Sequence, residues 1–167
     1  MHFVLHQACL LPLDLPRSAK VAIIIPRPKD LTPADTSSYL APSIASSLRC
    51  FHPGVDEILV ALDLPETELR AAVAHVRDYD LVIVGTINAT NHPGQAALVD
   101  LLLKHGVRVI AVALRMPYDL RSYPAAPTYL CTYSLLPPAL EALSKVLCGK
   151  TAPTGRLPVS IPGLYEM

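Results

Sequence analysis

The sequence predicts an α/β protein in which helices cover both faces of a mostly parallel sheet, and two observations from the middle of the chain lead to this prediction. Residues 80–86 and 107–114 are apolar runs rich in β-branched residues and too short for helices. Between them lie a polar turn and a helical pattern that ends at His105, with Gly106 as its stop signal. A strand, a helix and a strand in this order predict a right-handed crossover with both strands buried in a parallel sheet.

Similar apolar runs predict the other strands. They lie at residues 20–25, 57–62 and 128–132, with a short edge strand at residues 3–5. Pro26 ends the first long run, because proline has no N–H group to donate to a sheet ladder. Together with the helices, these runs predict a three-layer α/β/α sandwich around a five- to six-stranded, doubly wound sheet of flavodoxin-like order.

Capping residues and apolar spacing predict the helices. Besides the central helix, which follows residue 95 and ends at residue 105, helices are expected at residues 32–48, 65–78 and 138–147. The helix at residues 32–48 begins with Thr32 as N-cap and Pro33 at the first helical position, and Pro42 is expected to kink or split it. In the helix at residues 65–78, Leu69 and Val73 fall on one apolar face.

The chain is interpreted as one α/β domain over residues 1–167, with a lead-in at residues 1–19 and an extended tail at residues 150–167. The lead-in either packs across the sheet or continues a longer chain upstream. With 51% hydrophobic residues, the chain can bury a substantial core. Lys+Arg and Asp+Glu both number 14, so no charge excess indicates nucleic acid or an anionic membrane surface.

The sequence lacks the residues that several classes of chemistry require. The first strand-to-helix turn, residues 26–30, has no glycine for a dinucleotide, and no phosphate-binding loop or GxSxG element occurs. Asp80 precedes its strand, so it sits at the wrong end for a response-regulator acid. The cysteines show no CxxC spacing and the six histidines are scattered, so neither a metal nor a cofactor is predicted. Reduced cysteines, no membrane-spanning run and no secretory signal favour a cytoplasmic location.

Parallel sheets of this kind bind ligands at the carboxyl ends of their strands, so the polar residues there are the candidate site. The candidates that face a ligand or partner are Asn88, Asn91, Gln95, Arg115, Tyr118, Asp119, Tyr133 and Ser134.

These residues have two interpretations. One is a polar rim that binds a small hydroxylated ligand or faces a partner domain. The other is that Asn88, Asn91 and Asp119 satisfy free backbone groups in turns, with Arg115 paired to Asp119 four residues on. The two His-Pro-Gly triplets, at residues 52–54 and 92–94, are interpreted as turns rather than catalytic sites.

Four stretches carry a family resemblance. They are residues 80–86 with Asn88 and Gln95, residues 112–120, residues 129–134, and the closing GRLPVSIPGLY of residues 155–165. In this order they resemble the C-terminal α/β-sandwich domain of glycoside hydrolase family 3, in its β-N-acetylhexosaminidase (β-N-acetylglucosaminidase) branch. The resemblance covers nearly the whole chain.

The resemblance implies that a TIM-barrel domain precedes this one and holds the nucleophilic Asp, an Asp-His acid/base pair and most sugar contacts. That barrel is absent from these 167 residues, so no catalytic residue is carried over. In other branches the second domain supplies an acid/base Glu, and no residue here matches it. Met116 stands where the resemblance leads us to expect Asn, and this departure counts against ligand binding at that turn.

The expected function is therefore that of an accessory domain of a hexosaminidase-like glycoside hydrolase in amino-sugar or peptidoglycan turnover. It would pack on a barrel, in the same chain or another, and lend a loop to the cleft edge without catalysing hydrolysis alone. The alternative is a stand-alone module that binds a small sugar, or a homo-oligomeric interaction domain.

Overall fold

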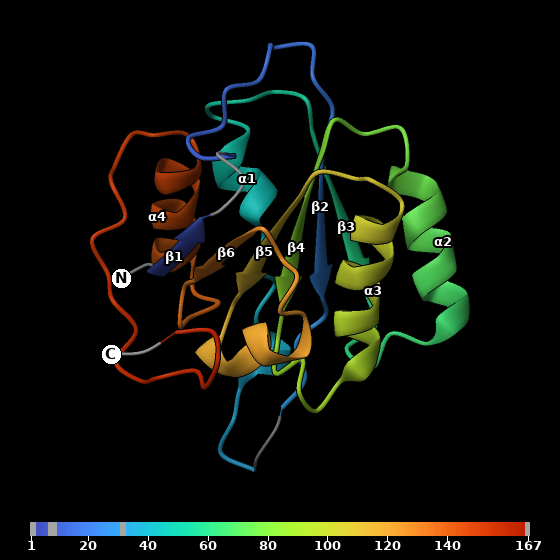
Figure 1. Ribbon diagram of the computed structural model, residues 1–167, viewed down its shortest axis with the longest axis vertical. Helices are drawn as coiled ribbons and strands as arrows, with labels where there is room; N and C mark the ends of the chain where they lie inside the picture. Colours follow the sequence, from blue (N-terminus) through green and yellow to red (C-terminus); the bar gives the residue numbers. More distant parts are fainter. Residues whose placement is uncertain (1–2, 7–9, 31–32, 166–167) are drawn as a thin grey trace.

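The computed structural model describes residues 3–6, 10–30 and 33–165, and Figure 1 presents it with the strands pointing downward. The strands are β1 (Phe3–His6), β2 (Val21–Pro26), β3 (Val55–Val60), β4 (Leu81–Thr86), β5 (Val109–Ala113) and β6 (Thr128–Cys131). The helices are α1 (Ile44–Leu48), α2 (Glu66–Val76), α3 (Pro93–Lys104) and α4 (Pro137–Leu147), with the 3-10 turns η1 (Ser37–Tyr39) and η2 (Pro117–Ser122). No helix in the described part is long and apolar enough to cross a bilayer.

The six strands form one sheet in the order β1-β6-β5-β4-β2-β3. Strands β2 to β6 pair in parallel, and β1 adds an antiparallel edge beside β6. Every residue of β2, β4 and β5 is buried, which is why these strands are almost continuously apolar. The doubly wound, flavodoxin-like sheet is thus confirmed.

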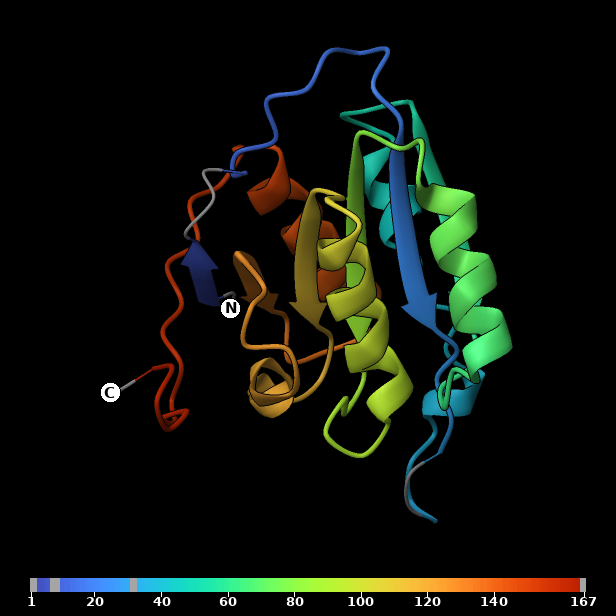
Figure 2. The same ribbon diagram turned by 45° about the vertical axis from the view of Figure 1, so that its right-hand side comes forward.

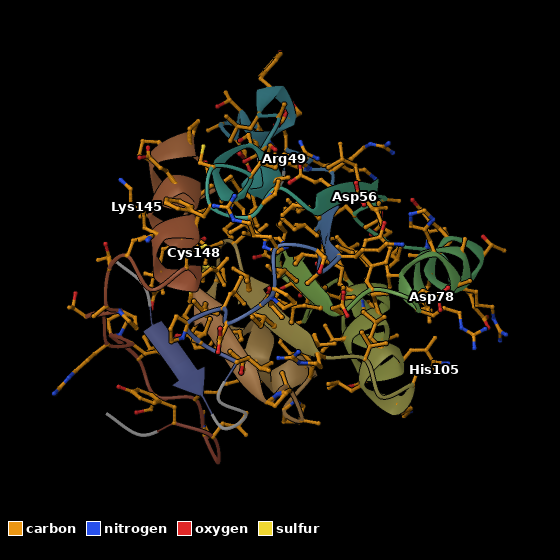
Figure 3. All side chains as sticks on the ribbon, turned by 90° about the horizontal axis from the view of Figure 1, so that it is seen from above. Arg49, Asp56, Asp78, His105, Lys145 and Cys148 are labelled. Carbon is orange, nitrogen blue, oxygen red and sulfur yellow. The ribbon has the colours of Figure 1, made fainter. Side chains whose placement is uncertain are left out.

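Helices cover the sheet on both faces (Figures 1 and 2). Successive side chains of β2 alternate between the two cores: Ile24 packs with residues of α2 and α3, and Ile23 packs with residues of α1 and α4. Figure 3 looks onto the amino edge of the sheet, where Cys148 at the end of α4 and His105 at the end of α3 lie on opposite sides. The result is a three-layer α/β/α sandwich.

The described part of the lead-in, residues 10–19, packs on the amino edge of this sandwich. The N–H of Leu13 donates to the carbonyl of Leu147 at the end of α4 (2.7 Å). The ring of buried His52 bonds to the carbonyl of Ala19 (2.8 Å), so the first His-Pro-Gly turn anchors this segment. The described part of the lead-in thus packs against α4 and the core on the α1–α4 face of the sheet.

The tail returns along the side of the molecule that ends with β1 (Figures 1 and 2). Its side chains Leu157 and Ile161 are buried in the core on the α2–α3 face of the sheet. The N–H of Ile161 donates to the carbonyl of Tyr165 (2.7 Å), which closes a turn at the end of the chain. The tail is therefore part of the folded unit.

The prediction of a helix from Thr32 to Leu48 is wrong over most of its length. Thr32 itself lies outside the described residues, and α1 begins only at Ile44, with Ser43 as its N-cap. Before it, Asp30 accepts hydrogen bonds from both the N–H and the hydroxyl of Ser38 (2.8 and 2.7 Å). Such local bonds from aspartate and serine side chains compete with helical hydrogen bonds and hold this segment in turns.

Candidate functional site

The candidate site lies at the carboxyl edge of the sheet, the lower edge in Figure 1. The loop after β4 carries Asn88 and Asn91, Gln95 lies in the first turn of α3, and the segment after β5 carries Arg115, Tyr118 and Asp119. Tyr133 and Ser134 follow β6. The structure therefore brings all eight candidates to one edge, and it distributes them between the interior and the surface.

Gln95 is a buried support of this edge. Its Oε1 accepts the N–H of Ile87 (2.8 Å), and its Nε2 donates to the carbonyls of Leu62 (2.9 Å) and Ile87 (3.2 Å). The amide thus ties the loop after β4 to the loop after β3. Both polar atoms of this side chain are engaged with backbone groups inside the protein.

Asp119 is also buried, and its carboxylate holds the loop after β4. Its Oδ2 accepts the hydroxyl of Thr86 (2.6 Å), and its Oδ1 accepts the N–H of Ala89 (2.9 Å). Thr86 is hydrogen-bonded in turn to the hydroxyl of Tyr123 (2.9 Å). Burial raises the pKa of Asp119 to about 6, and the bonds from Thr86 and Ala89 oppose that rise.

Arg115 does not pair with Asp119, contrary to the expectation from their spacing. Its Nη1 lies 2.9 Å from Oδ2 of Asp35, in the segment between β2 and α1. Asp35 also accepts the N–H of Ser37 (2.9 Å). The ion pair therefore fastens that segment to the end of β5. Asp35, which the sequence placed at the start of a helix, is thus one of the residues that build this edge.

Asn88 has a backbone conformation that non-glycine residues rarely adopt, with φ of 52°. Its Oδ1 is buried and has no hydrogen-bond partner among the described residues. Its carbonyl accepts the N–H of exposed Asn91 (2.9 Å), which closes a turn. Asn88 therefore combines backbone strain with an unsatisfied acceptor, a combination that recurs at binding sites.

Tyr133 shares the positive φ, at 59°, and lies beside the thiol of Cys131. Burial raises the pKa of the Tyr133 hydroxyl, and burial also raises the pKa of Cys131, to about 12. Cys131 is therefore a protonated, unreactive thiol near neutral pH. Half-buried Ser134 accepts the N–H of Leu136 through its hydroxyl (3.1 Å), and Tyr118 is half-buried.

A second polar group at this edge was not among the predicted site residues. His92 places Nδ1 2.7 Å from Oδ1 of Asp63, and Nζ of Lys29 lies 3.3 Å from Oδ2 of the same carboxylate. The hydrogen bonds from His92 and Lys29 lower the pKa of Asp63. These residues lie in loops after three different strands. The signal in the sequence that could have identified them is that each closely follows a predicted strand.

The second His-Pro-Gly triplet is a close contact between loops. A Cβ atom added to Gly94 would clash with the carbonyl oxygen of Leu64 and would lie 2.9 Å from the carbonyl oxygen of Asp63. Glycine is therefore required where α3 begins against the loop after β3.

The polar side chains at this edge stabilise loops, and their functional groups are largely occupied by hydrogen bonds within the protein. The most perturbed carboxyl, Asp119, is enclosed and occupied by Thr86 and Ala89. In residues 3–6, 10–30 and 33–165, no three His, Cys, Asp or Glu side chains are grouped to hold a metal. The fold and this edge define an α/β-sandwich domain with polar loops at the carboxyl ends of its strands.

The particular family follows from comparison with known proteins. The sequence profile described as the glycosyl hydrolase family 3 C-terminal domain matches residues 5–166. The chain belongs to this family. A comparison with curated proteins finds no match.

Solved structures of β-N-acetylglucosaminidases are similar to the chain. The fungal multi-domain family 3 β-N-acetylglucosaminidase with a GCN5-related glucosamine N-acetyltransferase region superimposes with a TM-score of 0.82 at 26% identity, over 99% of this chain. The family 3 β-N-acetylglucosaminidase from Paenibacillus sp. str. FPU-7 gives 0.80 at 25% identity, over 94% of this chain. The β-glucosidase from Listeria innocua, at 18% identity, 90% coverage and a TM-score of 0.67, shares the fold.

The chain corresponds to a minor part of each of these proteins. It spans 18% of the fungal chain, 30% of the Paenibacillus chain and 24% of the Listeria chain. The greater part of each of those polypeptides lies outside the matched region.

Proposed function

We propose that this chain is the accessory C-terminal domain of a β-N-acetylglucosaminidase-like glycoside hydrolase, which packs on a catalytic barrel and does not hydrolyse glycosides alone. The observation that carries the proposal is the similarity over 94% of this chain to only 30% of the Paenibacillus enzyme. The full protein would cleave O-glycosyl bonds of amino sugars, in peptidoglycan or amino-sugar turnover. Three described cysteines, Cys50, Cys131 and Cys148, are unpaired, which supports a cytoplasmic location.

The internal use of polar groups at the carboxyl edge supports an accessory rather than a catalytic role. Glycoside hydrolysis requires two carboxyl groups, or their equivalents, on either side of the scissile bond. Asp119 is buried against Thr86 and Ala89, and Asp63 lies between His92 and Lys29.

An activity assay tests this proposal. The purified chain is expected to give no turnover of an aryl β-N-acetylglucosaminide, because the groups that would attack and protonate the bond belong to the barrel. A blot of source-cell lysate with an antibody to this domain would give the length of the native polypeptide. Saturable hydrolysis that persists through repurification and is lost in a variant of this chain would overturn the proposal.

The second candidate is a stand-alone module that binds an amino sugar, and the unsatisfied Oδ1 of Asn88 favours it. Because this atom is buried, a ligand hydroxyl could donate to it only after a movement of the loop that follows β4, and the bond would then remove the cost of an unpaired acceptor. Binding of N-acetylglucosamine at a hundredfold excess over Kd would stabilise the fold by about 2.7 kcal/mol. An unchanged melting temperature with N-acetylglucosamine and with a muropeptide would count against this candidate.

A further inference from the structure

Large apolar side chains are exposed at the carboxyl edge of the sheet. Tyr39 is 85% exposed, Leu136 51% and Met116 44%. They follow three different strands, β2, β6 and β5, so the topology alone brings them to one edge. We call these three residues the apolar patch. Contiguous exposed apolar surface on a folded domain marks an interaction site.

The members of the apolar patch are brought near one another by their neighbours in the chain. Residues 39–43 line a hollow of about 180 Å³ together with Leu135 and Pro137, the two neighbours of Leu136. Met116 follows Arg115, whose ion pair with Asp35 binds the segment that carries Tyr39. The segments that carry the three side chains therefore meet at the same part of the carboxyl edge.

The segment that presents Tyr39, residues 33–39, is held by side-chain hydrogen bonds to Ser37 and Ser38. Asp30 accepts the N–H of Ser38 (2.8 Å), and Asp35 accepts the N–H of Ser37 (2.9 Å). The segment projects beyond the ends of the strands in Figures 1 and 2. Ordering a flexible loop on association costs free energy, and a segment already fixed in its conformation avoids that cost. An exposed tyrosine on such a segment has the properties of an interface anchor.

We propose that the apolar patch is the surface through which this domain docks on the catalytic barrel of its family, and this inference rests on the proposed function. The similar enzymes carry 70% or more of their polypeptide outside the region matched by this chain, so the matched domain faces a large body of protein. A second candidate surface is the groove of about 920 Å³ between α2 and α3. Its rim carries charges of both signs, Glu66, Arg70, Arg77, Asp100 and Lys104, as solvated helix surfaces do.

A grafted enzyme tests the proposal. In the Paenibacillus β-N-acetylglucosaminidase, this chain would replace the segment that it matches, and amide hydrogen exchange would be compared with that of the free chain. The expected result is exchange slowed by about tenfold or more in residues 37–40 and 135–140, with little change in the α2–α3 groove. Tyr39→Ser with Leu136→Ser should return exchange at these residues to the rate in the free chain. Leu59→Ser, which removes an exposed side chain from β3, is the matched control and should leave the slowing intact.

The outcomes separate this inference from the proposed function. Slowed exchange in the α2–α3 groove instead of the apolar patch would overturn the inference and leave the accessory function standing. A folded graft in which no surface shows slowed exchange would overturn both the docking inference and the accessory function. A graft that fails to fold would count against the inference, because a docking surface of this family should pack on the barrel of another member. Slowed exchange at Tyr39 when N-acetylglucosamine is added to the free chain would assign the patch to sugar binding and overturn docking.

Discussion

Polar residues at the carboxyl edge divide by burial into those that hold loops and those that face solvent. Gln95 and Asp119 hydrogen-bond to backbone groups or to Thr86 inside the protein, whereas Asn91, four residues before Gln95, is exposed. In sequence these residues look equivalent, because each follows a strand and each is polar. Their burial is decided by partners about thirty residues away, such as Leu62 for Gln95. The location of the eight site residues could therefore be predicted, and their exposure could not.

Replacing Gln95 with Met should destabilise the fold by about 2 to 4 kcal/mol, because it leaves the N–H of Ile87 and the carbonyl of Leu62 buried without partners. Methionine keeps the length of the side chain, so lost hydrogen bonds dominate the change. The free energy of unfolding in urea measures it. Asn91→Ala, in the exposed turn before α3, is the control and should change stability by less than about 0.5 kcal/mol. Equal effects of the two substitutions would contradict the supporting role of Gln95.

The buried carboxyl of Asp119 should make stability depend on pH in the direction opposite to that of most carboxylates. Burial raises its pKa from 3.8 to about 6, so the ionised form is favoured in the unfolded chain. Its stabilising contribution is full below about pH 4 and is lost as pH rises towards 6, by about 3 kcal/mol in total.

Asp119→Asn should remove this dependence. The amide oxygen can still accept from Ala89, and the amide N–H can donate to Thr86, whose hydroxyl then donates to Tyr123. Urea unfolding at several pH values between 4 and 7 measures the slope, with Asp14→Asn on the exposed lead-in as control. A slope that survives in Asp119→Asn would assign the pH dependence to another group.

At the scale of elements, apolar runs were the reliable signal and polar segments were not. Buried parallel strands are apolar throughout, so β2, β4 and β5 could be located to within a few residues. The segment before α1 misled the prediction because Thr32-Pro33 has the form of a helix start, while Asp30 and Asp35 bond to serine groups instead. Such competition depends on side-chain geometry that local spacing does not encode.

The ends of α3 and α4 offer a matched pair of glycines that tests how the lead-in is seated. Gly106 and Gly149 both have positive φ, at 73° and 67°, so alanine should cost about 1 kcal/mol at either from backbone strain. A side chain on Gly106 would meet nothing within 4 Å, whereas one on Gly149 would lie 2.7 Å from Cβ of Pro12. Gly149→Ala should therefore cost about 1 to 2 kcal/mol more than Gly106→Ala in urea unfolding. Equal costs would mean that the lead-in does not rest on the end of α4.

At the scale of the whole molecule, both ends of the described chain are built into the domain. The lead-in bonds to α4 through Leu13, and the tail buries Leu157 and Ile161 on the opposite face of the sheet. The sequence predicted an extended tail but not its contacts, because a proline-rich stretch has no periodicity from which a buried face can be identified. The family resemblance, by contrast, used this irregular stretch, residues 155–165, together with three stretches from the region of the sheet.

The tail should unfold together with the sheet rather than separately from it. Leu157 and Ile161 pack in the core that also holds Tyr129, with Tyr133 and Tyr165 packed against it, so the tail covers the face of the sheet beside β6. Leu157→Ala and Ile161→Ala should each lower the free energy of unfolding by about 2 to 4 kcal/mol, as expected for truncation of a fully buried aliphatic side chain. Half-buried Val159, between them, is the control, and its replacement by alanine should cost clearly less. A single cooperative transition, shifted to the same extent by fluorescence and circular dichroism, is the expected result. If both variants instead kept the parent stability while protease cut the tail more readily, the tail would be an appendage, and the face beside β6 would have to be covered by another part of the full enzyme.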